Sequence, residues 1–325
     1  MEPLERIEFE AARLVTEHPP RWRDRNKQAV FGATGGPEPP FAGVVVYARW
    51  PVIAWPRAVP APARIEIRPG YYDYAPSAGD GVVDWHVNFA DPHLFVAYGG
   101  PLLAQDEMQV LEHPVLGSLR EALVASGRRA ATRGAAGEPT PVTVTGVQRR
   151  CALDTFPDAA AGHPRDLYGN AFSCAPVAEV LAATRPLDPP PSSNILALAA
   201  PAGGRGPYDR AELEDVLATA HTGFAATRRE SGRLGGPGAR PIVHTGFWGC
   251  GAFGGNRAVM TVLQALAADL ARVDLVFHAG AGRGPADAEE ALREYVGLRG
   301  DGTGVDAIVD GLLRGGHRWG VSNGT

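Results

Sequence analysis

The stretch HTGFWGCGAFGGNRAVMTVLQALAADL, residues 244–270, decides the fold. A short apolar run enters a cluster of glycines and leaves it directly as a helix with apolar periodicity. Glycines let the backbone approach a ligand closely, and the amino end of a helix adds unpaired N–H groups and a partial positive charge. The stretch therefore predicts a strand, a phosphate-binding turn and a helix. The turn comprises Gly249, Cys250, Gly251, Ala252, Phe253, Gly254 and Gly255.

Two other interpretations of this turn stay open. Gly249, Gly251 and Gly254 fit the G-x-G-x-x-G fingerprint of a dinucleotide-binding site. That fingerprint is normally followed, about 20 positions later, by an acid at the carboxyl end of the next strand. Here Asp274 begins that strand and His278 ends it. The third interpretation is a tight turn whose glycines serve packing alone.

Composition indicates a globular protein with few of the usual metal or polyanion signatures. With 325 residues and 45% hydrophobic content, the chain is large enough for a buried core. A formal net charge of −5 lacks the basic excess that drives binding to phosphate backbones, so we expect no general nucleic-acid binding. The three cysteines form no C-x-x-C pair and the histidines are scattered, so no disulfide framework, metal site or cofactor is expected. Cys250, at a helix amino end, is in a position that can depress a thiol pKa, but no base accompanies it.

The amino-terminal residues give no sign of a targeting segment. MEPLERIEFEAARLV is charged from its second residue and lacks the apolar core of a signal peptide. No run approaches the roughly 18 apolar residues of a membrane span, so we expect no membrane association and a cytoplasmic protein.

Strand and helix patterns alternate along the chain. Residues 4–17 have the spacing of an amphipathic helix that lies against the main body. Strand patterns occupy residues 44–47, 63–68, 82–89, 142–147, 194–199, 242–245 and 274–278. Helix patterns occupy residues 105–126, interrupted at Pro114, and residues 210–229 and 256–271. This alternation predicts an α/β fold with a largely parallel or mixed sheet covered on both faces.

Two carboxylates begin the first of those long helices. Gln105-Asp106-Glu107 directly follows the loop Tyr98-Gly99-Gly100-Pro101. Acids in a first turn complement the helix dipole and are common without any catalytic role. Neighbouring helical residues diverge by about 100°, so we expect no more than one of the two carboxyls to face a pocket squarely.

Together these strings resemble the catalytic domain of poly(ADP-ribose) glycohydrolase, a macrodomain with insertions, over roughly residues 63–280. TGFWGCGAFGG, residues 245–255, is similar to the family's second phosphate-binding segment. VNFAD, residues 87–91, upstream of QDE, residues 105–107, is similar to its catalytic segment. The resemblance implies a three-layer α/β/α macrodomain over residues 63–315. Residues 1–62 would then be an accessory helix with loops, and residues 316–325 a flexible tail.

The resemblance also implies roles for individual residues. Glu107 would be the catalytic acid, and Asp106 the neighbour that positions the ribose. Tyr168 would close over the ligand, and Asp73 would meet the adenine edge beside Tyr72. Other ADP-ribose contacts would come from the glycine-rich turn and from Gln105, Asn88, Asp91, Gly99 and Gly100.

The chain departs from the family at three places. Phe95-Val96-Ala97 stands where the family has three consecutive glycines, Asp106 replaces a glutamate, and Gly280 stands where the family has an aromatic residue. These changes surround the leaving group rather than the phosphates. We therefore expect hydrolysis of a non-polymer or mono-ADP-ribosyl bond to a protein side chain, a nucleobase or a small molecule. A non-catalytic ADP-ribose reader and an enzyme acting on an NAD-derived metabolite are the alternatives.

Overall fold

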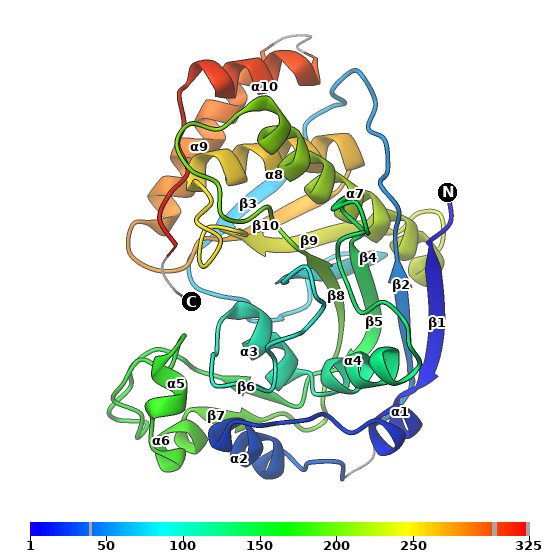
Figure 1. Cartoon of the computed structure of the whole chain (residues 1–325), viewed down its shortest axis with the longest axis vertical. Helices are drawn as coiled ribbons and strands as arrows, with labels where there is room; N and C mark the ends of the chain where they lie inside the picture. The colour runs from blue at the N-terminus through cyan, green and yellow to red at the C-terminus, as the bar shows by residue number, and fades with distance from the viewer. Residues whose placement is uncertain (39–40, 301–303, 323–325) are drawn as a thin grey trace.

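An eight-stranded sheet runs through the computed structural model, which describes residues 1–38, 41–300 and 304–322 (Figure 1). The strand order is β1-β2-β5-β8-β4-β9-β10-β3. Strands β8, β4, β9, β10 and β3 are parallel, whereas β1, β2 and β5 pair antiparallel, so the sheet is mixed as predicted. The bounds are β1 Glu5–Glu10, β2 Val44–Arg49, β3 Ile65–Arg68, β4 Val82–Phe89, β5 Val142–Gln148, β8 Ser192–Leu198, β9 Arg240–Gly246 and β10 Asp274–His278.

Helices cover both faces of the sheet, as Figure 1 shows. Side chains of β8 alternate between two cores, because Leu196 and Leu198 point to one face and Ile195 and Ala197 to the other. The predicted three-layer α/β/α architecture is thereby confirmed. The first face carries α7 (Arg210–Gly235) and α8 (Arg257–Ala271), with α9 (Gly284–Arg299) and α10 (Val305–Arg314) packed on them; the second carries α1 (Ala11–Glu17), α3 (Gln105–Glu112) and α4 (Val115–Ala125).

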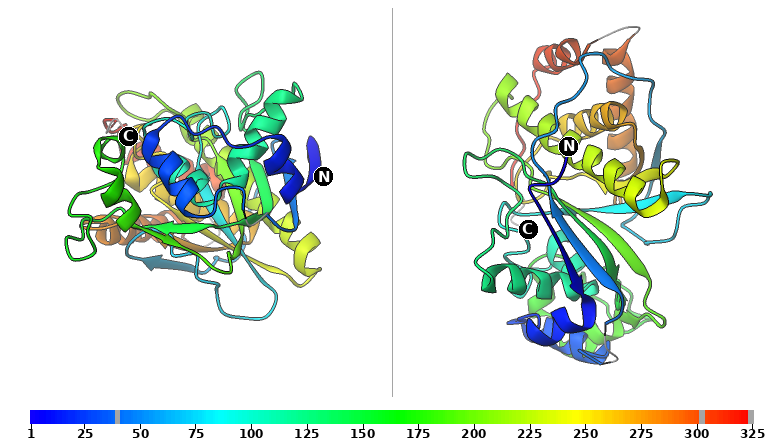
Figure 2. Two further views of the ribbon diagram at one scale, coloured as in Figure 1. Left: turned by 90° about the horizontal axis from the view of Figure 1, so that it is seen from below. Right: turned by 90° about the vertical axis from the view of Figure 1, so that its right-hand side faces the viewer.

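A small subdomain lies beside α3 and is seen from below in Figure 2. It is built from the ribbon of β6 (Cys151–Leu153) and β7 (Thr184–Pro186) together with α2 (Arg25–Ala33), α5 (Ala171–Cys174) and α6 (Val177–Ala182). Its apolar cluster includes Val30, Leu153 and Phe172 together with Leu111 of α3, so the subdomain packs against α3. The subdomain therefore joins an amino-terminal helix to a segment from the middle of the chain.

The predicted helix over residues 4–17 is wrong for residues 5–10. These residues form β1, which pairs with β2, and only residues 11–17 are helical. The apolar Ile7 and Phe9 alternate with charged residues at a period of two, a strand signal that the helical spacing obscured. Two strands of the sheet thus come from residues 1–62. The division of the chain into residues 1–62, 63–315 and 316–325 otherwise stays a prediction.

Two further features of the chain bear on the sequence predictions. Pro114 separates α3 from α4, as expected. The flexible tail is wrong for residues 317–320, because Trp319 stacks on Tyr208 with ring centroids 4.5 Å apart and the Gly320 N–H donates to the Gly254 carbonyl at 2.8 Å. Residues 323–325 lie outside the described residues.

Within the described ranges, no helix combines the length and apolar character needed to cross a lipid bilayer.

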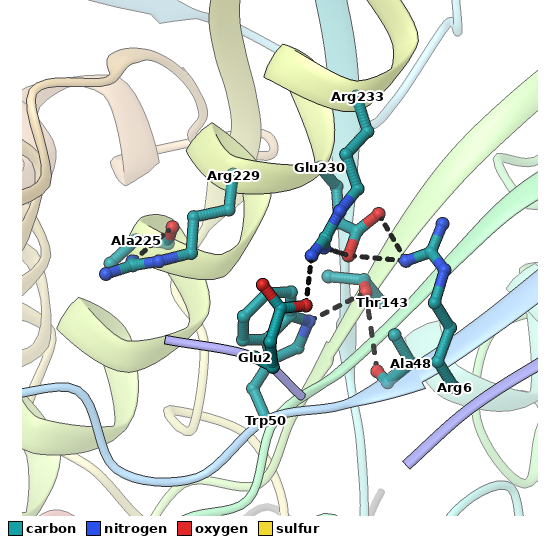
Figure 3. A network of polar contacts seen from close by, with 9 residues as sticks. All are labelled: Glu2, Arg6, Ala48, Trp50, Thr143, Ala225, Arg229, Glu230 and Arg233. Carbon is teal, nitrogen blue, oxygen red and sulfur yellow. Dashed lines mark hydrogen bonds and ion pairs between the residues drawn. The ribbon is translucent and has the colours of Figure 1, made fainter. Parts of the chain in front are cut away.

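A buried carboxylate ties β1 to α7 (Figure 3). Arg6 donates to both oxygens of Glu230, at 2.8 and 2.9 Å. Arg233 also donates to Glu230, at 2.7 Å, and its guanidinium lies 5.5 Å from the Trp50 ring. Because Glu230 is 2% exposed, the two arginines, rather than water, compensate its negative charge.

We predict that Glu230→Gln lowers the free energy of unfolding by about 1–3 kcal/mol, because Arg6 loses its anion and Arg233 keeps only the exposed Glu2. The matched control is Arg13→Gln, which breaks the exposed Arg13–Glu17 pair and should cost about 0.5 kcal/mol or less. Urea denaturation measures both values. Equal losses in the two variants would show that this network does not hold β1 in place.

Candidate active site

A cleft lies at the edge of the sheet where the parallel strands end. The loops after β3, β4, β9 and β10 meet there because these strands share one direction. One cavity of about 810 Å³, here the large lobe, adjoins a second of about 410 Å³, here the small lobe. Phe89, Gln105, Tyr168 and Gly251 line both, so the two lobes form one continuous cleft.

The glycine-rich loop after β9 lines the small lobe with Gly249, Gly251, Ala252 and Phe253. Within the part of the chain that the structure describes, no acceptor is found for the backbone N–H groups of these four residues. Consecutive free amides on a loop form an anion-binding concavity. The loop therefore presents free donors where the sequence predicts a phosphate-binding turn, and phosphate binding itself stays a prediction.

Most other donors near this loop are already engaged. The N–H groups of residues 250, 254 and 255 donate to carbonyls within the loop. The side chain of Asn256 caps α8 by accepting from the N–H groups of Ala258 and Val259, at 3.0 and 3.3 Å. The expectation that the amino end of the helix supplies unpaired N–H groups is therefore wrong for these two amides, and the free donors lie in the loop itself.

Gly249 shows why the loop needs glycine. Its φ is +76°, and a Cβ there would lie 2.6 Å from Cβ of Ala200 and 2.8 Å from Cε of Met260. Backbone conformation and packing thus both require glycine at this position. The interpretation of the glycines as packing residues is compatible with phosphate binding.

Asp106 and Glu107 occupy the first turn of α3 and line the small lobe together with that loop. Their side chains are nearly buried, with 6% and 4% exposure. Asp106 Oδ1 accepts a hydrogen bond from Asn88 Nδ2 at 3.0 Å, and Glu107 Oε2 accepts one from the Ala104 N–H at 3.0 Å. Both carboxyls therefore reach the cavity wall, and the expectation that at most one of them faces the pocket squarely stays a prediction.

Burial raises the pKa of both carboxyls. For Asp106 the negative charge of Glu107 adds to the rise, and the hydrogen bond from Asn88 opposes it. For Glu107 the hydrogen bonds from its own N–H and from Ala104, together with the charge of Lys27, lower the pKa without cancelling the effect of burial. Two adjacent carboxyls of this kind titrate as a pair. The site therefore retains a carboxyl proton at a higher pH than exposed acids do.

Gln105 joins the start of α3 to the end of β4. Its Oε1 accepts from the Phe89 N–H at 2.7 Å, and its Nε2 donates to the Val87 carbonyl at 3.0 Å. These two bonds fix the helix whose next two residues are the carboxyls. The side chain predicted to contact ADP-ribose thus lines the cleft while it positions Asp106 and Glu107.

The other predicted residues fall into two groups. Asp91 lines the small lobe, Asp73 lines the large lobe, and Tyr168 lies at the junction of the two. Gly99 and Gly100 line neither cavity. A Cβ on Gly99 would come within 2.2 Å of the Arg21 carbonyl oxygen, so this residue allows close approach of another segment rather than of a ligand.

Asn88 and the segment Phe95-Val96-Ala97 complete the description of the site. Asn88 is fully buried beneath Asp106 and lines neither lobe, so its contact is with the carboxyl rather than with a ligand. Val96 and Ala97 line the small lobe, whereas Phe95 is buried with φ at +53°. The residues that replace the family's three glycines therefore form part of the wall near Glu107.

Four histidines that are far apart in the sequence converge behind the large lobe: His86, His113, His244 and His278. His244 lies between His278 Nε2 at 3.0 Å and Asp84 Oδ1 at 3.1 Å, and His278 Nδ1 faces the Tyr71 carbonyl at 3.1 Å. His278 Nδ1 donates to that carbonyl, so its Nε2 accepts from His244 Nδ1. Among the described residues, no group of three His, Cys, Asp or Glu side chains could hold a metal.

Cys250 lines the large lobe as a protonated thiol. Burial raises its pKa to about 12, against a small opposing effect of Arg257. The depressed thiol pKa that its position near a helix end allows is therefore not found, because the loop buries the sulfur.

Residues 184–283 match the family model described as poly (ADP-ribose) glycohydrolase (PARG), macro domain fold. This segment contains β8, α7, β9, the glycine-rich loop, α8 and β10. The predicted resemblance to poly(ADP-ribose) glycohydrolases is confirmed. It holds for the half of the site that carries the free loop amides. No curated protein gives a significant sequence match to the chain.

Solved structures similar to this chain include three bacterial examples. Poly(ADP-ribose) glycohydrolase from Thermomonospora curvata is 18% identical, with 88% of this chain and 85% of that one covered and a TM-score of 0.42. The Deinococcus radiodurans enzyme in complex with ADP-ribose is 16% identical, with 65% and 75% covered and a TM-score of 0.39. The Oceanobacillus iheyensis macrodomain with MES bound is 11% identical, with 67% and 87% covered and a TM-score of 0.37.

We predict that Glu107→Gln stabilises the folded protein at neutral pH. Because the pKa of Glu107 is raised on folding, its ionisation opposes folding, and stability is lost as pH rises above the unfolded value of about 4.3. The variant should therefore unfold at a higher temperature than wild type at pH 8 and at about the same temperature at pH 4. Glu289→Gln, on the exposed face of α9, is the control. A variant less stable than wild type at pH 8 would contradict the assigned direction.

Proposed function

We propose that this chain is an ADP-ribosyl glycohydrolase that binds ADP-ribose and hydrolyses a ribosyl C1″ bond with Glu107 as general acid and base. One observation carries the proposal. The small lobe has four loop amides without acceptors among the described residues and, in the same wall, two buried carboxyls with raised pKa values. An anion site next to a protonated carboxyl suits a substrate with a phosphate beside a glycosidic bond.

The two lobes suit the two halves of ADP-ribose. The pyrophosphate would lie on the amides of Gly249, Gly251, Ala252 and Phe253, with the distal ribose toward Glu107. The adenosine would enter the large lobe, where tyrosines of residues 71–74 and Asp73 form part of the wall. Tyr168 lies at the junction and would cover the middle of the ligand. Binding energy from the phosphates then orients the reacting sugar.

In the proposed reaction, Glu107 first donates a proton to the leaving group and then accepts one from water. As the C1″ bond lengthens, the ribose gains oxocarbenium character and the leaving atom takes the proton from Glu107. A water molecule then adds to C1″ and gives its proton to the Glu107 carboxylate. The products are ADP-ribose and the protonated leaving group. Asp106, held by Asn88, would orient the ribose and stabilise its developing positive charge.

The lining of the small lobe favours a leaving group without phosphates. Among the described residues of its wall, the ionisable side chains apart from Tyr168 are Asp91, Asp106 and Glu107, and no Lys or Arg is present. A further ADP-ribosyl unit would bring a diphosphate toward these carboxyls. Val96 and Ala97 add an apolar face instead. This supports a mono-ADP-ribosyl bond to a protein side chain, a nucleobase or a small NAD-derived molecule.

One contact favours the alternative of a non-catalytic reader. Glu107 Oε2 caps α3 through the Ala104 N–H, a role that a carboxylate can fill without any catalysis. A reader would bind ADP-ribose as tightly as the proposed enzyme does. It would release no ADP-ribose from any substrate.

We predict that Glu107→Gln lowers the rate of ADP-ribose release by about 10²–10⁴-fold, because the amide cannot transfer the proton. The affinity for ADP-ribose should change by less than about threefold, since the amide keeps the bond to Ala104 and the phosphates bind elsewhere. The assay compares polymer, mono-modified protein, a modified nucleobase and an NAD-derived small molecule. Glu289→Gln is the charge-matched control. Unchanged turnover in Glu107→Gln would refute the role of this carboxyl, and release from none of the substrates by wild type would favour the reader.

We predict that Ala252→Glu weakens ADP-ribose binding by about tenfold or more relative to Ala252→Gln. Ala252 is exposed and lines the small lobe, so both side chains fit and differ in charge at the anion site. Calorimetry at low ionic strength measures the two dissociation constants. Equal constants would show that the pyrophosphate does not lie on this loop.

A further inference from the structure

Helix α2 places Lys27 beneath the loop that leads into the carboxyl pair. Lys27 is the only lysine of the chain and is fully buried. Its Nζ donates to the carbonyls of Tyr98 and Leu102, at 2.7 and 2.6 Å. Residues 98–102 end two positions before Ala104, whose N–H is held by Glu107. The ammonium group therefore binds the segment that sets where α3 begins.

The neighbouring residues support the same loop. The N–H groups of Arg23 and Asp24 donate to the Gly99 carbonyl, at 2.8 and 3.0 Å. The Tyr98 hydroxyl accepts from the Arg21 N–H at 2.6 Å. Gly99 packs against this segment so closely that a Cβ would collide with it. Residues 21–27 thus hold the loop along its length, and Lys27 supplies its buried cation.

Charge balance links Lys27 to the carboxyls. A buried ammonium group needs a compensating anion, and the charged groups that act on Lys27 are Glu107, Asp24, Asp106 and the repelling Arg23. Asp24 already accepts the capping N–H groups of α2 and lies closer to solvent. One ammonium beside two buried carboxyls is neutral when one carboxyl is ionised and the other keeps its proton.

We propose that Lys27 is a positioning residue of the active site, which anchors the 98–102 loop and compensates the charge of the Asp106–Glu107 pair. The proposal rests on the proposed function for its catalytic meaning, since general acid catalysis needs a carboxyl that carries a proton. The anchoring of the loop by Lys27 is present whether or not the chain is an enzyme.

The first test uses the fact that the chain has one lysine. Protein grown with ¹³Cε,¹⁵Nζ-lysine gives a single side-chain NMR signal, so Lys27 can be titrated directly. Burial lowers the pKa of Lys27 to about 8, and the carboxylates limit that fall. In Glu107→Gln the midpoint should therefore drop further, by about one pH unit. In Glu289→Gln it should stay where it is.

A midpoint for wild-type Lys27 near that of free lysine, about 10.4, would overturn the proposal. A midpoint that is unchanged in Glu107→Gln would overturn it as well. Neither outcome depends on catalysis. Failure of the proposed function, seen as no ADP-ribose release, is therefore distinguishable from failure of this inference.

The second test compares the pH–rate profiles of Lys27→Met and Lys27→Arg on the substrate that wild type cleaves. Loss of the cation removes the group that lowers the carboxyl pKa values, so the profile of Lys27→Met should move to higher pH by about one unit or more. Lys27→Arg keeps the charge and should keep the position of the profile, with a lower kcat. Arg13→Met, which removes an exposed cation of α1, is the control.

A lower kcat without any shift of the profile in Lys27→Met would reduce Lys27 to a structural support of the loop and overturn its electrostatic role. The same shift in both Lys27 variants would also contradict the proposal, because one of them retains the charge. If Lys27→Met does not fold, the titration of Lys27 in the wild-type protein and in Glu107→Gln decides the question.

Discussion

The burial of two adjacent carboxyls at the first turn of α3 is the constraint on which the rest of the site depends. Carboxylates at a helix amino end are ordinarily exposed and ionised, because water and the helix dipole both favour the charge. Here both carboxyls are nearly buried in the cavity wall that they share with the glycine-rich loop. The cost of that burial is offset by hydrogen bonds from Asn88 and Ala104 and by the cation of Lys27.

Segments from both ends of the chain support this arrangement. The amino-terminal residues 21–27 hold the loop that precedes α3, while the carboxy-terminal Gly320 donates to the carbonyl of Gly254 in the glycine-rich loop. The family model matches the middle of the chain, residues 184–283. The family model therefore covers the glycine-rich side of the cleft, and the carboxyl pair at the start of α3 lies outside the matched residues.

The sequence predicted what local patterns control. Apolar runs predicted the strands of the sheet, the glycine cluster predicted the loop after β9, and Pro114 predicted the break between α3 and α4. It failed where long-range contacts decide. Burial of Lys27, the meeting of four distant histidines and the capping of α8 by Asn256 depend on residues brought together only by folding. At residues 5–10 two periodicities compete, and pairing with β2 selects the strand.

The most direct measurement is a crystal structure of the Glu107→Gln protein with ADP-ribose bound. It should show the pyrophosphate within hydrogen-bond distance of the amides of residues 249–253. The anomeric carbon of the distal ribose should lie beside the side chain at position 107, with the adenosine in the large lobe. A ligand in the opposite orientation, or a distal ribose outside the small lobe, would contradict the assignment of Glu107 as the group that transfers the proton.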